Sequence, residues 1–526
     1  MHRASDLTLM QTSLLRAWKP LAGGLAVVGG SAYYLTRPST FDLPIKVAGP
    51  DGKAQMSTRT LPLLPMQTIN ERLRKDSTSE TVSRPDGITW RYTTASLPSN
   101  DPIEDAHSHQ IIERDDALAS GDYLFFNVFD GHRGPETSRL LSRVLIDAVA
   151  LELTQLANST GALNSKSFTS KLFGSSTSSS QPDIASTIEK AFTKLDSLLM
   201  DAPVTILQNH LKERSSKDLT IPDLSKDVQG MSAMQAAISG SCALMALFDT
   251  AQRNLYVALT GDCRAVAGVW EPTANGKGAW KVDVLTEDQT ARNPSEVKRI
   301  QSEHPPEEAE YVVKNGRVLG GLEPSRAFGD ARYKWTARAQ GLLNQVYMIG
   351  NGTPLRKAPL TLKTPPYVTA KPVVTRRTVD FENPASLRFL VIATDGLWDA
   401  LSSEDVVSLV GGHLAGLKGT IPKEQLPSLV PTSTANAGLD GKPHIQKKKD
   451  GGSWAFVDDN VSTHLIRNAL GGGDEMALRR MMSIPAPYSR RYRDDITVKV
   501  IWWEHGKEDQ ATVTSFSPSD PVKSKL

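Results

Sequence analysis

The 526-residue chain contains only two cysteines, Cys242 and Cys263. So few thiols argue against a disulfide framework, and neither cysteine has the paired spacing of a zinc site. Both stand beside apolar segments, so we predict that they are small buried core residues. This cysteine content fits a reducing compartment or an organelle matrix.

The chain also lacks a surplus of charge, with 60 Lys and Arg residues against 58 Asp and Glu residues. No global field of the kind found in nucleic-acid-binding proteins results, and we predict no nucleic-acid partner. Several catalytic motifs are missing as well. The sequence has no GxxxxGK(S/T) phosphate loop, no GxSxG nucleophile elbow and no kinase-like set of glycine loop, lysine and catalytic loop.

Residues 1–40 are predicted to be a targeting segment, because a single acid, Asp6, accompanies several basic and hydroxyl residues, as in mitochondrial presequences. The apolar, Gly-rich residues 20–35 come close to the roughly 17 residues needed to span a membrane. They could anchor the protein or be a sorting signal that is cut away. A secretory signal is the competing interpretation, and the reduced cysteines argue against it.

Residues 506–526 are predicted to be a flexible tail that ends in Ser524-Lys525-Leu526. This tripeptide is the carboxy-terminal peroxisomal address that an import receptor binds, although tripeptides also occur by chance. The two ends together predict dual targeting, with mitochondria favoured.

Between the ends, residues 41–85 are rich in Pro and Thr and are predicted to be a linker. A single catalytic domain is expected at 86–505, with disordered insertions near 162–183 and 411–453. The spacing of apolar residues after Pro135 predicts a long helix that packs one face on a sheet. Short apolar runs predict buried strands at 123–129, 243–248, 255–259, 387–393 and 496–502.

Two of these strands run directly into Asp-Gly, at Asp130-Gly131 and at Asp395-Gly396. The pair Asp494-Asp495 precedes a third strand, and Glu104-Asp105 follows Pro102-Ile103. Clustered oxygen ligands of this kind suit magnesium or manganese, and buried carboxylates without a cation would repel one another strongly. Each Asp-Gly taken alone could simply be a turn. The whole set favours metal-assisted hydrolysis.

At this point the motifs resemble those of the type 2C protein phosphatases, and within them the pyruvate dehydrogenase phosphatases. The family-level segments are Pro-Ile-Glu-Asp at 102–105, Val-Phe-Asp-Gly-His at 128–132, Ser-Gly-Ser-Cys-Ala at 239–243, Thr-Gly-Asp-Cys-Arg-Ala-Val at 260–266, Ser-Arg-Ala-Phe-Gly-Asp at 325–330, Ala-Thr-Asp-Gly-Leu-Trp-Asp at 393–399 and Asp-Asp-Ile-Thr-Val at 494–498. The subfamily-level segments are 97–105, 364–370, 463–467 and 492–498.

The resemblance implies an α+β fold, namely an α/β/β/α sandwich of two packed antiparallel β-sheets flanked by helices, with a binuclear metal cleft at one end. It also implies two Mg²⁺ or Mn²⁺ ions per active site and a weaker third. Asp130 would bridge two metals, Asp395 and Asp494 would complete one site, and Glu104 with the Gly131 carbonyl would help to hold the other. The weaker third position would fall to Asp330.

Other polar residues near these motifs have competing interpretations. Asp105 and Asp262 are expected to fix loops by hydrogen bonds and are left outside the metal set. Asn100 takes the place of a phosphate-binding arginine of general family members and would offer uncharged hydrogen bonds to the phosphate. Arg133 could reach the phosphoryl oxygens, although a solvated or ion-paired surface arginine is the favoured alternative.

The resemblance predicts a serine/threonine phosphatase in which His132 is the general acid that protonates the leaving alkoxide. Outside this motif, a His after Asp-Gly would more often be an ordinary turn residue. The segment from Asp288 to Glu308 resembles a mobile flap that selects protein substrates. The expected substrate is the phosphorylated pyruvate dehydrogenase complex. A catalytically silent binding module, or a phosphatase with a peroxisomal substrate, are the alternatives.

Overall fold

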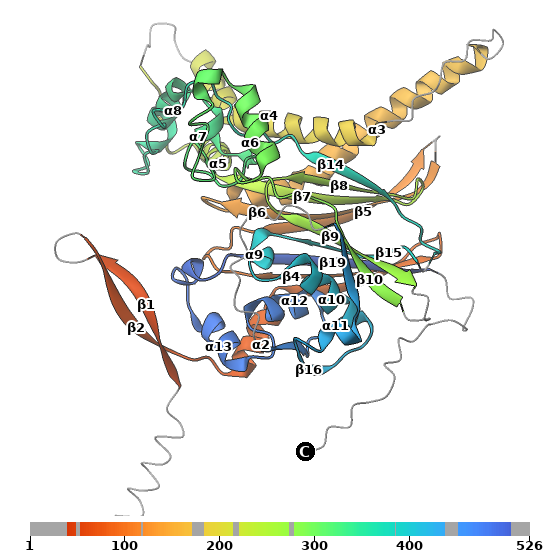
Figure 1. The fold of residues 1–526 in the computed structure, drawn as a ribbon. Coiled ribbons are helices and arrows are strands. Elements are labelled where there is room, and N and C mark those ends of the chain that lie inside the picture. The colour runs from red at the N-terminus through yellow and green to blue at the C-terminus, as the bar shows by residue number, and fades with distance from the viewer. Residues whose placement is uncertain are drawn as a thin grey trace, which may run out of the picture.

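Figure 1 shows the computed structural model of the chain, which describes residues 39–48, 53–116, 119–170, 183–213, 220–272, 278–383, 385–436 and 451–505. Residues 1–38 of the targeting segment, including the apolar stretch at 20–35, lie outside this description. The tail at 506–526 does so too. Within the described part, no helix is both long and apolar enough to cross a membrane.

Two β-sheets form the centre of the molecule. The first consists, in spatial order, of β17 (Thr432–Asn436), β10 (Gly278–Val284), β9 (Arg264–Pro272), β15 (Leu387–Ala393), β19 (Ile496–His505), β4 (Ile88–Leu97) and β3 (Ser77–Ser83). The second consists of β14 (Val373–Thr378), β8 (Asn254–Thr260), β7 (Gly240–Asp249), β6 (Ala119–His132) and β5 (Ala106–Asp116), with β13 (Phe328–Gly329) paired to β7. The strand pairs are antiparallel, except that β17 runs parallel to β10.

Apolar side chains from the facing sides of the two sheets make the central core. Trp90 on β4, Phe248 on β7 and Trp503 on β19 are at most 2% exposed and form edge-on or tilted ring contacts with centroids 4.9–5.6 Å apart. Strands buried on both faces read as nearly continuous apolar runs, which is why the sequence locates them well. This core holds the two sheets face to face.

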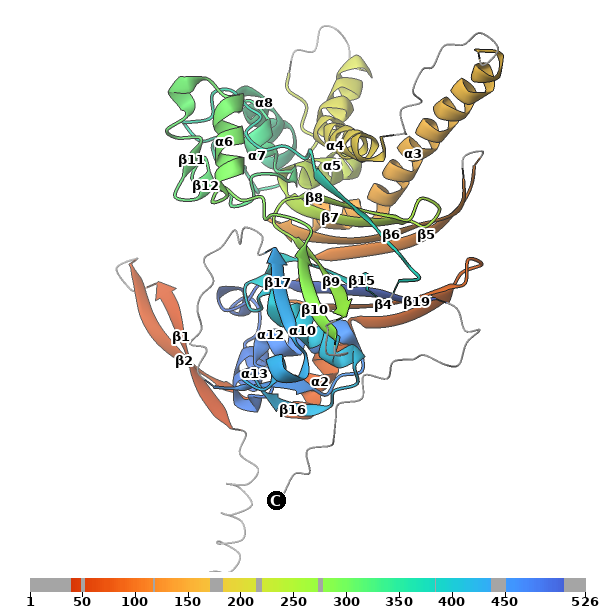
Figure 2. The same cartoon turned by 45° about the vertical axis from the view of Figure 1, so that its right-hand side comes forward.

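Helices cover both outer faces, as Figures 1 and 2 show. On the second sheet lie α3 (Glu136–Ser170) and α4 (Ile184–Glu213), together with α5 (Val228–Ile238), α7 (Ala331–Lys334), α8 (Ala337–Leu343) and the π-helical turn η3 (Asn344–Met348). On the first sheet lie α2 (Met66–Lys75), α9 (Asp395–Trp398), α10 (Ser403–Leu414), α11 (Leu426–Leu429), α12 (Val461–Leu470) and α13 (Glu475–Ser483). The predicted α/β/β/α sandwich is therefore confirmed.

Smaller elements complete the described chain. They are β1 (Thr40–Ala48), β2 (Ala54–Pro62), α6 (Pro294–Glu303), η2 (Pro306–Glu308), β11 (Val313–Lys314), β12 (Arg317–Val318), β16 (Gly419–Pro422), β18 (Ser453–Phe456) and η4 (Ser489–Arg491). The helix predicted after Pro135 is α3, which begins one residue later and buries Leu141, Leu145 and Val149 on the second sheet.

The insertion predicted at 411–453 is partly wrong. Gly411 and Gly412 belong to the last turn of α10, where an added Cβ would lie 2.3 Å from Trp280 Nε1 and 2.9 Å from Leu417 Cδ1. These glycines reflect close packing, not a loop. β16, α11 and β17 follow, and residues 437–450 lie outside the described part. In the insertion predicted at 162–183, α3 continues to Ser170, and residues 171–182 lie outside the description.

The linker predicted at 41–85 is also wrong, because this segment contains β1, β2, α2 and β3. The helix α2 buries Ile69 and Leu73 in the core beneath the first sheet, and these two residues stand one helical turn apart. The strand β3 pairs with β4 along its whole length but is the edge strand, so its side chains are mostly polar. A short helix and a polar edge strand give weak sequence signals.

Since α2 belongs to the core, we expect Ile69→Ala to destabilise the fold by about 2–5 kcal/mol, the usual cost of a buried Ile to Ala change. Chemical denaturation would measure it. Gln67→Ala, on the exposed face of the same helix, is the matched control and should cost less than about 0.5 kcal/mol. Equal effects of the two changes would mean that α2 is a peripheral attachment.

Candidate active site

Three carboxylates meet at one end of the sandwich. They belong to Asp130 near the end of the strand β6, Asp262 just after β8 and Asp395 at the start of α9. One carboxylate oxygen of each residue lies within 4.8 Å of the others. The ladder fixes Asp130, because β6 remains paired with β7 as far as His132. An all-oxygen donor set of this kind is compatible with Mg²⁺ or Mn²⁺.

The two Asp-Gly pairs are not ordinary turns. A Cβ on Gly131 would lie 2.1 Å from the Glu104 carbonyl oxygen, and a Cβ on Gly396 would lie 2.1 Å from the Asp495 carbonyl oxygen. In each pair, glycine lets the backbone that carries one acid touch the loop that carries another. This close approach is what gathers the acids from distant parts of the chain.

Asp494 lines a cavity of about 270 Å³ together with Asp262 and Asp395. Its carboxylate forms an ion pair of 2.6 Å with Arg490. The neighbouring Asp495 is buried and organises the loop opposite, since its oxygens accept hydrogen bonds from the backbone N–H groups of Ser99, Asn100 and Glu104. Of the two aspartates that precede β19, Asp494 therefore faces the cavity and Asp495 holds the opposite loop in place.

Glu104 and Asn100 lie in this anchored loop. Glu104 Oε1 accepts a 2.6 Å hydrogen bond from the Gly134 N–H, and Asn100 Nδ2 donates to Glu104 Oε2 and to Asp495 Oδ2. Asn100 thus places its amide between two carboxylates. A phosphate would have to compete with these bonds, so the predicted phosphate contact of Asn100 stays a prediction.

Asp105 and Asp262, both predicted to fix loops by hydrogen bonds, differ in their surroundings. Asp105 Oδ2 accepts a hydrogen bond from Thr394 Oγ1, in agreement with the predicted loop-fixing role. Asp262 belongs to the carboxylate group, although Cys242 Sγ also lies 3.0 Å from its Oδ1. Its position directly after the strand β8, as for Asp130 and Asp395 at their strands, was the signal that could have identified it.

Burial and mutual repulsion raise the pKa values of these acids. Burial raises the pKa of Asp130 well above its usual range, and Asp395 raises it further. Burial and then Asp395 raise the pKa of Asp494 to about 7. Burial likewise raises the pKa of Glu104. A divalent cation would reverse this situation, because its charge favours the ionised carboxylates.

His132 and Asp330 form a second polar group beside the carboxylates. Nε2 of His132 lies 2.6 Å from Oδ2 of Asp330, which is fully buried. Burial opposes protonation of the imidazole, but attraction to Asp330 outweighs it, so the pKa of His132 is raised. A Cβ on Gly240 would lie 2.1 Å from His132 Nε2, so the pair requires glycine there.

Asp330 therefore contacts the imidazole and lies outside the three-carboxylate group among the described residues. Its predicted role as a third-metal ligand stays a prediction. Arg133 has an exposed side chain and lines a small recess with Arg332 and Arg356. That placement agrees with the surface interpretation of this arginine.

The predicted flap, from Asp288 to Glu308, contains α6 and η2 and is tied to the body of the protein. Asp288 forms a buried ion pair of 2.7 Å with Arg264, and Glu296 on α6 bonds to Arg326, Arg299 and Ser325. These contacts fix the segment along one side of the carboxylate cavity.

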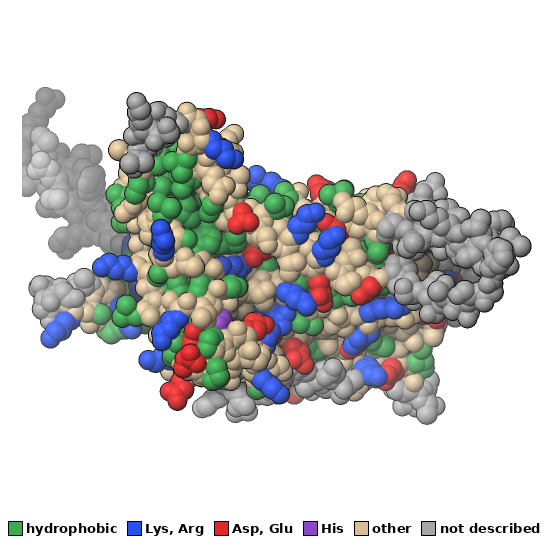
Figure 3. Space-filling model, turned by 90° about the horizontal axis from the view of Figure 1, so that it is seen from above, with side chains coloured by type: hydrophobic (Ala, Val, Ile, Leu, Met, Phe, Trp, Pro, Cys, Tyr) green, Lys and Arg blue, Asp and Glu red, His purple; other side chains and the backbone are tan. Residues whose placement is uncertain are grey.

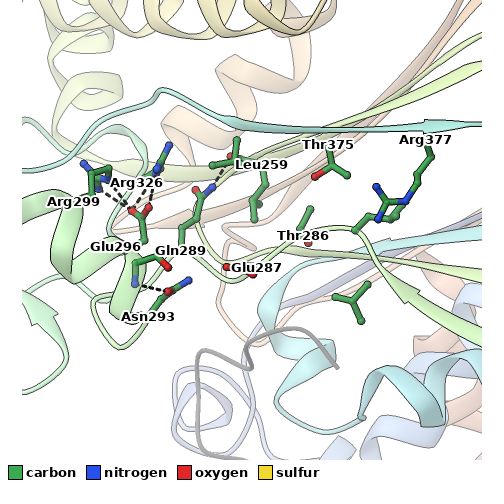
Figure 4. Close-up of a pocket in the computed structure, with 14 residues that line it drawn as sticks. Leu259, Thr286, Glu287, Gln289, Asn293, Glu296, Arg299, Arg326, Thr375 and Arg377 are labelled. Carbon is green, nitrogen blue, oxygen red and sulfur yellow. Dashed lines mark hydrogen bonds and ion pairs between the residues drawn. The ribbon is translucent and has the colours of Figure 1, made fainter. Parts of the chain in front are cut away.

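A larger cavity, of about 510 Å³, lies on the other side of this segment, between β14 and the end of β10 (Figure 4). Alternate residues of one extended stretch face the two cavities: Glu287 and Gln289 face the larger one, Asp288 and Thr290 the carboxylate cavity. Gln289 Oε1 accepts from the Gly261 N–H and its Nε2 donates to the Leu259 carbonyl. These bonds hold the turn that carries Asp262.

Comparisons with known proteins agree with this geometry. The protein phosphatase 2C family description matches residues 99–424. A protein phosphatase 2C homolog of Schizosaccharomyces pombe is 34% identical, covering 93% of this chain and 95% of its own length. The mitochondrial pyruvate dehydrogenase (acetyl-transferring) phosphatase 1 of Saccharomyces cerevisiae is 37% identical, covering 83% of this chain and 72% of its own length.

The mitochondrial pyruvate dehydrogenase (acetyl-transferring) phosphatase 2 of Homo sapiens is 33% identical, with 84% of each chain covered. The matched segments include the strand ends that carry Asp130, Asp262 and Asp395. From the carboxylate group, the sandwich fold and these matches together, the chain belongs to the protein phosphatase 2C family of metal-dependent serine/threonine phosphatases.

Proposed function

We propose that this phosphatase removes phosphate from serine residues of the mitochondrial pyruvate dehydrogenase complex and thereby activates it. The observation that carries the chemistry is the group formed by Asp130, Asp262 and Asp395. The substrate assignment is supported by relatives whose names specify pyruvate dehydrogenase, at 31–37% identity over most of the chain. The subfamily segments at 97–105 and 492–498 support it as well.

For the metals, we propose two Mg²⁺ or Mn²⁺ ions held by the carboxylates of Glu104, Asp130, Asp395 and Asp494 and by the Gly131 carbonyl. Asp262 is added to this set because its carboxylate lies within the cluster. When bound, such ions make a water molecule acidic enough to attack phosphorus at neutral pH and neutralise the phosphoryl oxygens. The chain's contribution is to fix these oxygens on rigid strand ends.

His132 is proposed as the general acid, because its imidazole lies beside the carboxylate group with its pKa raised and its Nε2 held by Asp330. Protonated, it can give a proton to the serine or threonine oxygen as the P–O bond breaks. Asp330 is proposed as a positioning residue that keeps the imidazole charged and oriented.

The cellular address extends this proposal. Mitochondrial relatives and the basic, acid-poor residues 1–40 support a mitochondrial location, in the matrix or at the inner membrane if residues 20–35 act as an anchor. The terminal Ser524-Lys525-Leu526 supports an additional peroxisomal pool, bound by the import receptor. Imaging fluorescent fusions with and without Leu526 tests that address, which fails if the peroxisomal signal does not change.

The first experiment compares phosphate release from phosphorylated pyruvate dehydrogenase and from an unrelated phosphoserine peptide, with Mg²⁺ or Mn²⁺ present. We expect release from both, a preference for the dehydrogenase, and a loss of at least about 100-fold in Asp130→Asn, since one central carboxylate is removed. Asp459→Asn is the matched control, because its carboxylate is 99% exposed. No release from a folded, metal-loaded protein would contradict a phosphatase and favour a silent binding module, whereas full activity in excess EDTA would contradict the metal-dependent mechanism.

A second prediction concerns Asp330. In Asp330→Asn, burial remains but the attraction to the carboxylate is lost, so the pKa of His132 should fall. We expect the fall of kcat on the alkaline side of its pH profile to move to lower pH by about one pH unit. The decrease in kcat should be larger for phosphoserine than for p-nitrophenyl phosphate, because the leaving group of the latter needs little protonation.

The double variant with His132→Asn provides the control for this prediction. If Asp330 acts through the imidazole, adding Asp330→Asn to His132→Asn should change kcat little further. Additive losses would show that Asp330 acts independently of His132, as a metal ligand would.

A third prediction links metal binding to pH. Asp494 titrates near pH 7 in the metal-free fold, against about 3.9 in an unfolded chain, so the folded state binds the proton more tightly. The resulting stability is present below about pH 4 and is lost as the pH rises through 7. Added Mg²⁺ should therefore raise Tm more at pH 8 than at pH 5.5. Asp494→Asn should reduce this difference, and an equal Tm increase at both pH values would contradict the assignment.

A further inference from the structure

The hairpin formed by β1 and β2 stands apart from both large sheets. It is a separate two-stranded sheet with nine residue pairs, and Figures 1 and 2 show it projecting from the body of the protein. A two-stranded hairpin is marginally stable by itself in water. Towards its tip, Val47 is 38% and Met56 is 65% exposed. The outer part therefore adds little to the core and exposes apolar side chains.

The base of the hairpin is packed firmly on the rim of the carboxylate cavity. Leu43 and Leu61 are buried against Ile484, and Met481 packs on the same cluster. Arg59 donates to the Tyr488 hydroxyl at 3.0 Å and lies over its ring. Met481 also lines the carboxylate cavity, so one side chain connects the hairpin base with the site.

The edge of β1 faces this rim. The hydroxyl of Tyr492, another residue lining the carboxylate cavity, donates a 2.7 Å hydrogen bond to the Pro44 carbonyl. Proline has no N–H for the ladder, so Pro44 and Thr58 form a pair without ladder hydrogen bonds. Hydrogen-bonded and non-hydrogen-bonded pairs alternate along an antiparallel ladder, so Lys46 and Met56 also form a pair without ladder hydrogen bonds. The N–H and C=O of Lys46 therefore point away from β2. No described strand pairs with this outer edge.

The hairpin has a small excess of basic residues. Between residues 40 and 62 the sequence carries Lys46, Lys53 and Arg59 against Asp42 and Asp51, and the Asp42 carboxylate accepts a hydrogen bond from Thr60. Arg491, adjacent to Tyr492, is exposed as well. A phosphoserine carries a charge of about −1.5 to −2 at neutral pH, and an unpaired strand edge binds extended peptides through main-chain hydrogen bonds.

We propose that the outer edge of β1, from Pro44 to Ala48, is a docking surface for the phosphoprotein substrate, which pairs an extended segment beside its phosphoserine with this edge. The inference rests on the proposed phosphatase function and adds the route by which a protein substrate is recognised. At about 3.4 Å per residue, the edge extends roughly 14 Å outward from Tyr492. A protein substrate can reach along it, whereas a small phosphate ester cannot.

The test compares kcat/KM on phosphorylated pyruvate dehydrogenase and on p-nitrophenyl phosphate, using the full chain. In one variant, Lys46–Met56 is replaced by Asn-Gly, so that the paired residues Ile45 and Ser57 flank the new turn and the register of the buried base is kept. We expect at least a tenfold loss on the protein substrate, mainly in KM, and a change of less than about twofold on the small ester. A circular dichroism melt checks that the shortened chain is folded.

A point variant keeps the proposal testable if the shortened chain does not fold. Lys46→Glu should lower kcat/KM on the protein substrate about threefold, with a larger effect at low salt. Lys418→Glu, at a side chain 67% exposed on the loop after α10, is the matched control and should have no effect. Inactivity of the wild-type chain on both substrates would refute the proposed function itself.

Three results would overturn the docking surface while leaving the phosphatase intact. One is unchanged kcat/KM on the protein substrate after the tip is removed. Another is a parallel loss on both substrates, which would give the hairpin a structural role at the rim. The third is a dimer in solution that disappears with the tip, which would assign the edge to a second copy of the chain.

Discussion

Repulsion among buried carboxylates is the constraint on which the rest of this structure depends. Asp130, Asp262 and Asp395 are held with their oxygens within 4.8 Å of one another, and the pKa of Asp494 nearby is raised to about 7. Such an arrangement costs free energy in the metal-free fold and is relieved by a divalent cation. The framework around it must therefore be rigid, since flexible acids would move apart.

Close contacts between backbone segments make this framework rigid. Gly131 on β6 of the second sheet lies against the Glu104 carbonyl in the loop that joins the two sheets, and Gly396 lies against the Asp495 carbonyl between two strands of the first sheet. Asp495 adds hydrogen bonds to the loop at 99–104, and Thr394 bonds to both Asp105 and the Thr497 N–H. Because each acid is joined to the support of the next, the site forms only when both sheets are packed.

The stretch at 286–290 and the β1–β2 hairpin lie beside the carboxylate cavity. The stretch at 286–290 separates the carboxylate cavity from the larger cavity, and Gln289 couples the two through the turn that carries Asp262. The β1–β2 hairpin stands on the other rim, joined through Tyr492 and Met481. The top face shows apolar side chains over the helical layer (Figure 3), and the exposed residues of this layer include Leu211 and Ile349.

The sequence by itself determined the buried strands, the long helix after Pro135 and the acids at strand ends, because long apolar runs and Asp-Gly junctions are strong local signals. The sandwich was implied by the resemblance of its motifs to those of the type 2C protein phosphatases. Tertiary structure decided the rest. It brought Asp262 into the carboxylate group, joined Asp330 to His132, and made core and edge elements of the segment expected to be a linker. These outcomes depend on contacts between residues far apart in the chain, such as Gly240 against the His132–Asp330 pair and Leu43 against Ile484, which no local pattern encodes.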